Sequence, residues 1–180
     1  MTERLFLAAA LSDDVRHGLA AFLTDETTRL PGRPAPPANW HVTLRFLGPT
    51  TASDRDRVLE FLDDHLVVEP FTLAFGGLGA FPKASRASVL WLGIERGAAK
   101  LTAVAEIAEA AAQSVGFEPE ERPFHPHLTL ARMRPPIDVR GLIETVPRFP
   151  LTMVVDRVTL YRSDLGRDGA RYEIADEVLL

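Results

Sequence analysis

The pattern His-x-Thr-Leu occurs twice in this chain, as HVTL at residues 41–44 and as HLTL at residues 127–130. Both copies lie in apolar, β-branched runs that are typical of strands. Because alternate residues of a strand point to the same face, each copy would present an imidazole and a hydroxyl side by side. Two such strands brought together would place two titratable rings and two hydroxyls around one point. This set of groups suits acid–base chemistry on a phosphate.

The repeat defines four candidate catalytic residues: His41, Thr43, His127 and Thr129. A lone His-x-Thr is more often a half-buried polar pair, but the chain has five histidines and two of them open the same pattern. Two histidines with pKa values of about 6.5 can act as acid and base at neutral pH. Threonine hydroxyls can donate to the non-bridging phosphate oxygens. Since one ring must be protonated and the other neutral, activity should have a bell-shaped pH dependence.

Three arginines are candidates for binding the phosphate of a substrate. Arg45 has the strand parity of His41, which predicts that its side chain lies on the same face. Arg132 has the parity of Leu130 instead, so its guanidinium would have to reach round from the end of the strand. Arg86 precedes the second strand of an expected central hairpin. The alternative for each arginine is a solvated or salt-bridged surface charge.

Three aromatic residues could stack on a nucleic-acid base: Phe46, Phe81 and Trp91. Phe81 is the candidate for substrate binding, whereas Phe46 and Trp91 are expected to pack in the core. Phe46 is assigned to the core because it continues the alternation of Val42 and Leu44, which would face away from the histidines.

The periodicity of apolar residues predicts a mixed α+β fold, with antiparallel strands and helices packed outside. A proline-rich loop at residues 31–37 is expected to rim the site. The two halves, divided near Gly79, each contain one long helix and one His-x-Thr strand, which suggests pseudo-two-fold symmetry. Strands are expected at 5–11, 41–48, 71–75, 88–94, 127–133, 151–161 and 171–174, and helices from Ser12 to near Leu30 and at 53–66, 101–115 and 138–146.

Composition describes an ordinary globular chain of 180 residues, expected to form one domain over residues 1–180. A net charge of −5 argues against extensive binding to nucleic-acid backbone, although a local basic cluster could hold one or two phosphates. The absence of cysteine excludes disulfides, thiol nucleophiles and cysteine-ligated metals. We expect no signal peptide and no membrane span, and hence a cytoplasmic protein, with a monomer as the default oligomeric state.

Together these features resemble the 2H phosphoesterase superfamily, which is named for two His-x-Thr/Ser patterns. The nearer resemblance is to its LigT-like branch, the RNA 2′,3′-cyclic phosphodiesterases, also called 2′-5′ RNA ligases. The chain departs from that pattern in an extra histidine, His125, before the second copy. The stretches that carry the resemblance are RLFLAAALSDDVR, NWHVTLRFLG, GAFPKASRASVLWLG, FHPHLTLARMR and LYRSDLGRDGARYEIADEVLL.

The resemblance implies two pseudo-symmetric lobes of antiparallel sheet around a central cleft. It also implies metal-independent hydrolysis of RNA 2′,3′-cyclic phosphate ends to 2′-phosphates, together with reversible 2′-5′ RNA ligation. His41 would be the proton donor and His127 the proton acceptor, while Thr43 and Thr129 would hold phosphate oxygens. No cofactor is implied, and the partners would be RNA ends or small nucleotides that bear a cyclic phosphate.

Two other functions stay open. A metal hydrolase would use His125 and His127, which have the same-face spacing of a zinc-ligand pair, although Pro126 separates them and no carboxylate accompanies them. A non-catalytic RNA- or nucleotide-binding module is the second, but binding alone would not need two histidines. Chelation tests the first and turnover of a cyclic nucleotide tests the second. His17 and His65 are expected on helix surfaces without a role.

Overall fold

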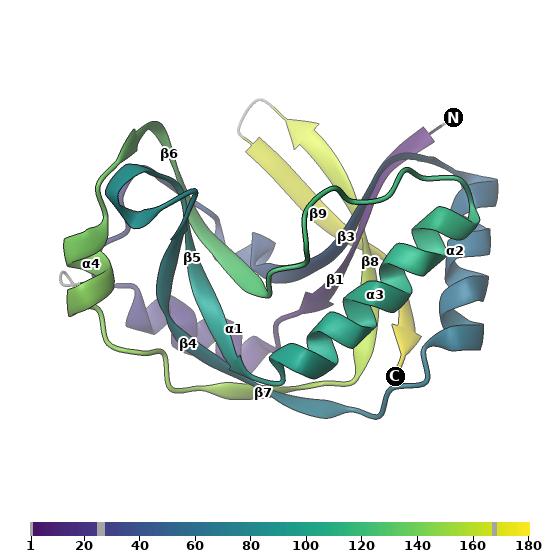
Figure 1. Ribbon diagram of the computed structural model, residues 1–180, viewed down its shortest axis with the longest axis horizontal. Coiled ribbons are helices and arrows are strands. Elements are labelled where there is room, and N and C mark those ends of the chain that lie inside the picture. The colour runs from purple at the N-terminus through teal and green to yellow at the C-terminus, as the bar shows by residue number, and fades with distance from the viewer. Residues whose placement is uncertain (1, 25–27, 167–168) are drawn as a thin grey trace.

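One curled sheet runs through both halves of the molecule (Figure 1). The computed structural model describes residues 2–24, 28–166 and 169–180, and nine strands of these residues belong to the sheet. All their pairings are antiparallel. The strands are β1 (Thr2–Ala10), β2 (Arg33–Pro34), β3 (His41–Thr51), β4 (Phe71–Phe81), β5 (Ala87–Arg96), β6 (His127–Ile137), β7 (Thr152–Val155), β8 (Arg157–Gly166) and β9 (Gly169–Leu179).

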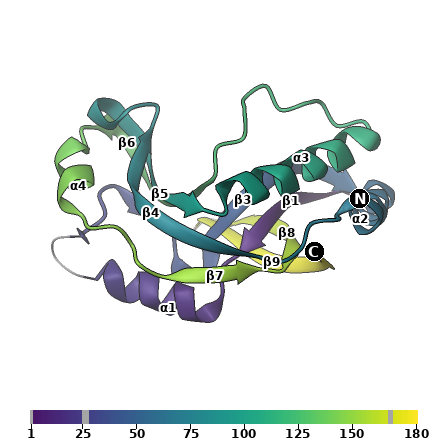
Figure 2. The same cartoon turned by 60° about the horizontal axis from the view of Figure 1, so that its bottom comes forward.

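Helices lie around the outside of this sheet, which confirms the predicted α+β class (Figures 1 and 2). Two of the helices each pack on the half of the sheet opposite to the strand that they follow in the chain. Helix α3 follows β5 but contacts β3. Helix α1 follows β1 but contacts the segment before β7, where the ring centroids of Phe22 and Phe149 are 5.3 Å apart. The helices are α1 (Asp13–Phe22), α2 (Ala52–His65), α3 (Ala98–Ser114) and α4 (Arg140–Thr145), with 3₁₀ turns η2 (Pro37–Asn39) and η3 (Ala84–Arg86).

The strand order has a pseudo-two-fold relation about its centre. Its path is β7-β4-β5-β6-β3-β1-β8-β9, with β2 paired to β6 outside it. The central strands β3 and β6 carry the two His-x-Thr patterns, and β1-α1-β3 corresponds to β5-α3-β6. The expected division near Gly79 is wrong, because Gly79 lies inside β4. The lobe of β1 and β3 is completed by β8 and β9 from the end of the chain.

Other differences concern where elements end. The strand expected at 151–161 is broken at Asp156, because β7 pairs with β4 at one edge of the sheet while β8 pairs with β1 in the other lobe. Helix α1 begins as expected after Ser12, whose hydroxyl accepts from the Val15 amide at 3.5 Å, but it ends at Phe22. Residues 25–27 of the expected helix and 167–168 of the expected last turn lie outside the described residues.

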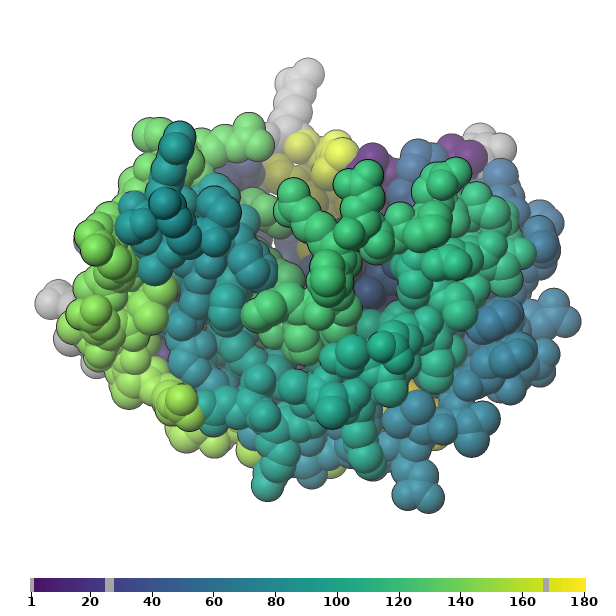
Figure 3. Space-filling model, in the orientation of Figure 1, coloured from purple at the N-terminus to yellow at the C-terminus, as the bar shows by residue number. Residues whose placement is uncertain are grey.

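Alternation along the strands gives the sheet a core side and a cleft side. Leu5, Leu7, Val42 and Leu128 are almost fully buried on the core side. The surface of the molecule is hollowed between the two lobes, on the side seen in Figure 3. No helix in the described part of the chain is long and apolar enough to cross a membrane.

Candidate active site

The two His-x-Thr patterns lie on neighbouring strands at the centre of the sheet. Val42 of β3 pairs with Leu128 of β6, and both side chains are fully buried. Continuing this antiparallel register by one residue puts His41 opposite Thr129 and Thr43 opposite His127. The four polar side chains therefore share the cleft side of the sheet, where cross-strand neighbours are within reach of one another.

The same kind of hydrogen bond orients both imidazoles. Nδ1 of His41 lies 2.8 Å from the carbonyl oxygen of Asn39, and Nδ1 of His127 lies 2.6 Å from that of His125. A carbonyl oxygen only accepts, so each Nδ1 donates and each Nε2 carries the lone pair when its ring is neutral. Nε2 of His41 is 2.9 Å from the hydroxyl of Thr43, which then donates to it.

Burial lowers the pKa of both rings. The pKa of His41 falls to about 4, chiefly through desolvation, against the opposing hydrogen bond to Asn39 and with further lowering by the charges of His127 and Arg16. Desolvation also lowers the pKa of His127, with further lowering by His125 and Arg132. The charge of His127 is among the causes that lower the pKa of His41, so the two rings are close enough to interact electrostatically. Both rings are held neutral at pH 7 in the unliganded protein.

A β-bulge breaks the strand parity of the first pattern. In the pairing of β1 with β3, Leu7 is the partner of Arg45 and Ala8 is the partner of Thr43, so Leu44 is an extra residue. The residues after the bulge consequently exchange faces. The parity that predicted Arg45 beside His41 does not extend past Leu44.

The prediction that Arg45 binds substrate is wrong. Its side chain is 7% exposed and lies on the core side, where its guanidinium forms an ion pair with Glu109 of α3. It also donates to the carboxylate of Glu120 at 2.8 Å and to the backbone carbonyl of Glu118. Arg45 thus ties β3 to α3 and to the loop that leads into β6.

Phe46 takes the place on the cleft side that was expected for Arg45. Its side chain is 57% exposed, so the prediction of a core position is wrong. Its ring centroid is 5.8 Å from that of Phe6, which in turn is 4.8 Å from His41.

A bulge at the same place in the second pattern has the opposite consequence for Arg132. In the pairing of β5 with β6, Leu90 is the partner of Ala131 and Trp91 is the partner of Thr129, so Leu130 is the extra residue. Arg132 therefore lies on the cleft side without reaching round the strand end. Its charge contributes to the lowered pKa of His127.

Arg33 was missed as a candidate by the sequence analysis. It is the cross-strand partner of Arg132 in the pairing of β2 with β6. The proline-rich loop thus rims the site as expected, and it also brings a second arginine next to Arg132.

Aromatic rings line the cleft around His127. Phe81 packs edge-on against His127 at 5.0 Å and lies 5.2 Å from Trp91, and its contact with a substrate stays a prediction. Trp91 was expected in the core, and this prediction is wrong. Its ring forms the wall of the cleft over Gly79, where a Cβ would collide with it. His125 joins this group, 5.0 Å from Trp91.

The opposite wall, around His41, was not found from the sequence. Tyr172 packs edge-on against His41 at 5.3 Å, and Tyr161 is 5.9 Å from it. Phe6 stacks on Tyr161 at 5.2 Å. The alternation of β1 contains the signal for Phe6, but Tyr161 and Tyr172 reach the site only because β8 and β9 pair beside β1.

Arg16 of helix α1 holds the backbone segment that leads to His41. Its guanidinium donates to the carbonyl of Pro37 at 2.5 Å, of Leu11 at 3.2 Å and of Trp40 at 3.5 Å. These bonds fix the backbone immediately before His41. No sequence signal distinguishes Arg16 from other exposed helix positions.

The remaining arginine and histidine candidates lie at exposed positions. Arg86 is exposed in η3, at the tip of the β4–β5 hairpin, and its contact with a phosphate stays a prediction. His17 and His65 lie on exposed helix positions, and His65 stacks on Phe61. Within residues 2–24, 28–166 and 169–180, no three His, Asp or Glu side chains are grouped so as to hold a metal ion.

Comparison with known proteins identifies the class to which this fold and cleft belong. Residues 9–167 match the model of the 2′-5′ RNA ligase superfamily. A relative from Aeropyrum pernix, named RNA 2′,3′-cyclic phosphodiesterase, is 32% identical over 174 residues, which cover 94% of this chain and 93% of the relative. The chain therefore belongs to the 2′-5′ RNA ligase superfamily, and within it to the RNA 2′,3′-cyclic phosphodiesterases.

Solved structures agree with this assignment. The apo form of E. coli LigT superposes with a TM-score of 0.81 at 29% identity, covering 99% of this chain and 98% of LigT. E. coli LigT in complex with 3′-AMP gives a TM-score of 0.81 at 28% identity, covering 100% of this chain and 99% of that one. The predicted LigT-like fold is confirmed.

Proposed function

We propose that this protein hydrolyses RNA 2′,3′-cyclic phosphate ends to 2′-phosphates, with His41 and His127 as acid and base and without a metal ion. The observation that carries the proposal is the matched pair of imidazoles on one face of two adjacent strands. The name of the Aeropyrum pernix relative and the 3′-AMP complex of E. coli LigT support a nucleotide or RNA substrate.

The reaction divides between the two rings. His127 Nε2 takes a proton from a water molecule whose oxygen attacks phosphorus. The bond from phosphorus to the ribose 3′ oxygen breaks, and that oxygen takes a proton from His41 Nε2. The ester to the 2′ oxygen is kept, so the product is the 2′-phosphate. Thr43 and Thr129 donate to the non-bridging oxygens, and Arg132 balances their developing charge. With the 5′ hydroxyl of a second RNA as the nucleophile in place of water, the same steps would form a 2′-5′ linkage.

Substrate binding favours protonation of the acid, which takes its proton from the solvent. In the unliganded cleft the lowered pKa values keep both rings neutral at pH 7. An anionic phosphate between the rings favours the imidazolium form and raises these pKa values. The acid is therefore protonated as the substrate binds, while the aromatic walls exclude water from the rest of the cleft.

We further propose that residues 1–180 act as one domain and as a cytoplasmic monomer.

The test is turnover of a short RNA that ends in a 2′,3′-cyclic phosphate, in excess EDTA. We expect full activity and a 2′-phosphate product, identified by ³¹P NMR. Activity that is lost with EDTA and restored by zinc would favour a metal site at His125 and His127 instead. Binding of the RNA without any turnover would favour a binding module.

A further inference from the structure

The carbonyls that orient the two imidazoles are held in place by different means. Asn39 and His125 occupy the same position, two residues before the histidine whose Nδ1 donates to them. His125 is followed by Pro126, and a residue before proline is confined to extended backbone. Asn39 is followed by Trp40 and has no such restriction. Another contact must therefore hold the carbonyl that orients His41.

The backbone around Asn39 supplies only part of that support. Asn39 ends η2, a single 3₁₀ turn without a side-chain cap. A turn this short has few hydrogen bonds of its own and depends on contacts with the rest of the fold. Arg16 of α1 binds the carbonyls of Pro37 and Trp40 on either side, and the carbonyl between them is left to His41. The direction of this carbonyl is then set by what holds Asn39 itself.

The side chain of Asn39 is bound to the other end of the chain. Its Nδ2 donates to the carbonyl oxygen of Ala170 at 2.7 Å, across 131 positions of sequence. Ala170 lies at the start of β9, which ends the path of the sheet in the described part of the chain. Carbonyls on the outer side of such an edge strand have no neighbouring strand to accept from. Asn39 thus satisfies an edge carbonyl with its amide while its own carbonyl accepts from His41.

The same part of β9 forms the wall over His41. Tyr172, two residues beyond Ala170, packs edge-on against the imidazole, with 5.3 Å between the ring centroids. A Cβ on Gly169 would lie 2.8 Å from the guanidinium of Arg33, so the loop before β3 meets the β8–β9 hairpin at a second point. Since β2 pairs with β6, this loop contacts both lobes of the cleft.

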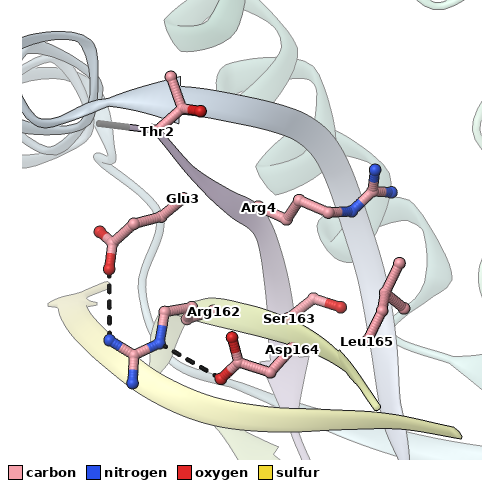
Figure 4. A pocket seen from close by; sticks show the side chains of 7 residues that line it. All are labelled: Thr2, Glu3, Arg4, Arg162, Ser163, Asp164 and Leu165. Atoms are coloured by element: carbon pink, nitrogen blue, oxygen red, sulfur yellow. Dashed lines mark hydrogen bonds and ion pairs between the residues drawn. The ribbon is translucent and has the colours of Figure 1, made fainter. Parts of the chain in front are cut away.

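On its solvent side the β8–β9 hairpin is held more weakly. Figure 4 shows Arg162 of β8 joined to Glu3 of β1, with 3.2 Å between nitrogen and oxygen. An ion pair between solvent-accessible side chains contributes little to stability. Leu165, the cross-strand partner of Ala170, is 69% exposed and adds little packing. The bond from Asn39 is therefore the stronger constraint on this end of β9.

We propose that Asn39 is a positioning residue for the proton donor: its amide, bound to β9, holds its carbonyl where that carbonyl keeps the proton of His41 on Nδ1. The proton that His41 gives up is then always the one on Nε2, the nitrogen that lies 2.9 Å from the hydroxyl of Thr43. The same bond keeps Tyr172 against the ring. Asn39 acts through His41 and not on the substrate. The inference deepens the proposed function and rests on it.

The test compares the wild type with Asn39→Leu, which keeps the size of the side chain but has no amide to donate. With a short RNA that ends in a 2′,3′-cyclic phosphate, we expect kcat to fall by roughly tenfold to a hundredfold, as for a misplaced catalytic group, while KM stays within about twofold. ¹⁵N NMR of the histidine rings at pH 7 should show His41 as the Nδ1–H tautomer in the wild type and as a mixture of tautomers in the variant.

Thr102→Val is the matched control. It removes another half-buried side-chain bond to a carbonyl, from Thr102 to Ala98 at 2.9 Å within α3, and should keep both kcat and the tautomer of His41. Asn39→Ser repeats the test should the leucine variant not fold, because a serine hydroxyl is too short to reach Ala170.

An unchanged kcat in Asn39→Leu overturns the inference, as does a lower kcat with His41 still wholly in the Nδ1–H tautomer. A lower urea midpoint with kcat and tautomer kept would also overturn it, because Asn39 would then only stabilise the fold. If the wild type turns over no cyclic phosphate, the proposed function has failed. The tautomer of His41 in the two proteins still tests the role of Asn39, since that measurement needs no turnover.

Discussion

At the scale of single residues, the cleft gives two identical side chains different surroundings. His41 is enclosed by Phe6, Tyr161 and Tyr172, and desolvation brings its pKa down to about 4. His127 lies against Phe81 beside an arginine. Unlike surroundings are what allow two histidines to take opposite roles in one reaction.

Replacement of either histidine should abolish most of the activity. We expect His41→Ala and His127→Ala each to lower kcat by roughly 10²- to 10⁴-fold, the usual contribution of a positioned acid or base. The double variant should lose far less than the product of the two, because the rings act as a unit. Thr43→Ala and Thr129→Ala should lose less than either, since each removes a neutral donor that water can partly replace.

The internal control for this series is His125→Ala. His125 lies beside His127 and contacts Trp91 and Phe81, but it stands outside the repeated pattern. Steady-state kinetics on one cyclic nucleotide would rank the variants. Severe loss in His125→Ala together with a mild loss in His41→Ala would contradict the assignment of the repeated histidines as acid and base.

At the scale of elements, strand parity explains both what the sequence predicts and where it fails. Alternation holds from each histidine to its threonine, so the four polar groups were found correctly on one face. It breaks at the next residue, Leu44 or Leu130, because bulges arise from pairing with β1 and β5. A bulge depends on the neighbouring strand, which local periodicity does not contain. The misplacement of Arg45, Phe46 and Arg132 has this single cause.

The new place of Arg45 predicts a loss of stability and not of catalysis. Arg45→Met would leave Glu109 and the Glu118 carbonyl without their cation, and breaking such a buried pair costs on the order of 3 kcal/mol. We expect a lower urea midpoint, with kcat/KM of the folded variant within about tenfold of wild type.

Arg140→Met is the matched control, because its ion pair with Asp138 is exposed on both sides and its loss should leave the urea midpoint almost unchanged. If Arg45→Met kept the wild-type urea midpoint and lost its activity, the side chain would have to act in the cleft after all.

At the scale of the whole molecule, the cleft exists because one sheet curls so that its two lobes face each other across β3 and β6. The lobes are assembled from distant segments, with β8 and β9 completing the lobe that β1 begins. The order of strands and helices was readable from the sequence. The partners of β7, β8 and β9 were not, because these pairings join segments far apart in the chain and depend on which sheet edges the other strands leave unpaired.

Burial of two neutral histidines makes the stability of the whole fold depend on pH. In the unfolded chain a histidine has a pKa of about 6.5, whereas the folded pKa of His41 is about 4 and that of His127 is also lowered. Between these values the unfolded state binds more protons than the folded state. The free energy of unfolding is therefore highest above pH 6.5 and falls as the pH drops toward 4, by up to about 1 kcal/mol per pH unit for one ring.

Urea unfolding at pH 7 and pH 5 measures this dependence. Asp138 and Asp156, whose pKa values are lowered by their arginine partners, titrate below this window and do not account for it. We expect His41→Leu to reduce the loss of stability between the two pH values, with exposed His17→Gln as the control that keeps it. Inorganic phosphate should also reduce the loss, because an anion in the cleft stabilises the protonated rings of the folded state. A wild-type urea midpoint that is equal at pH 7 and pH 5 would contradict the neutral, desolvated state of His41.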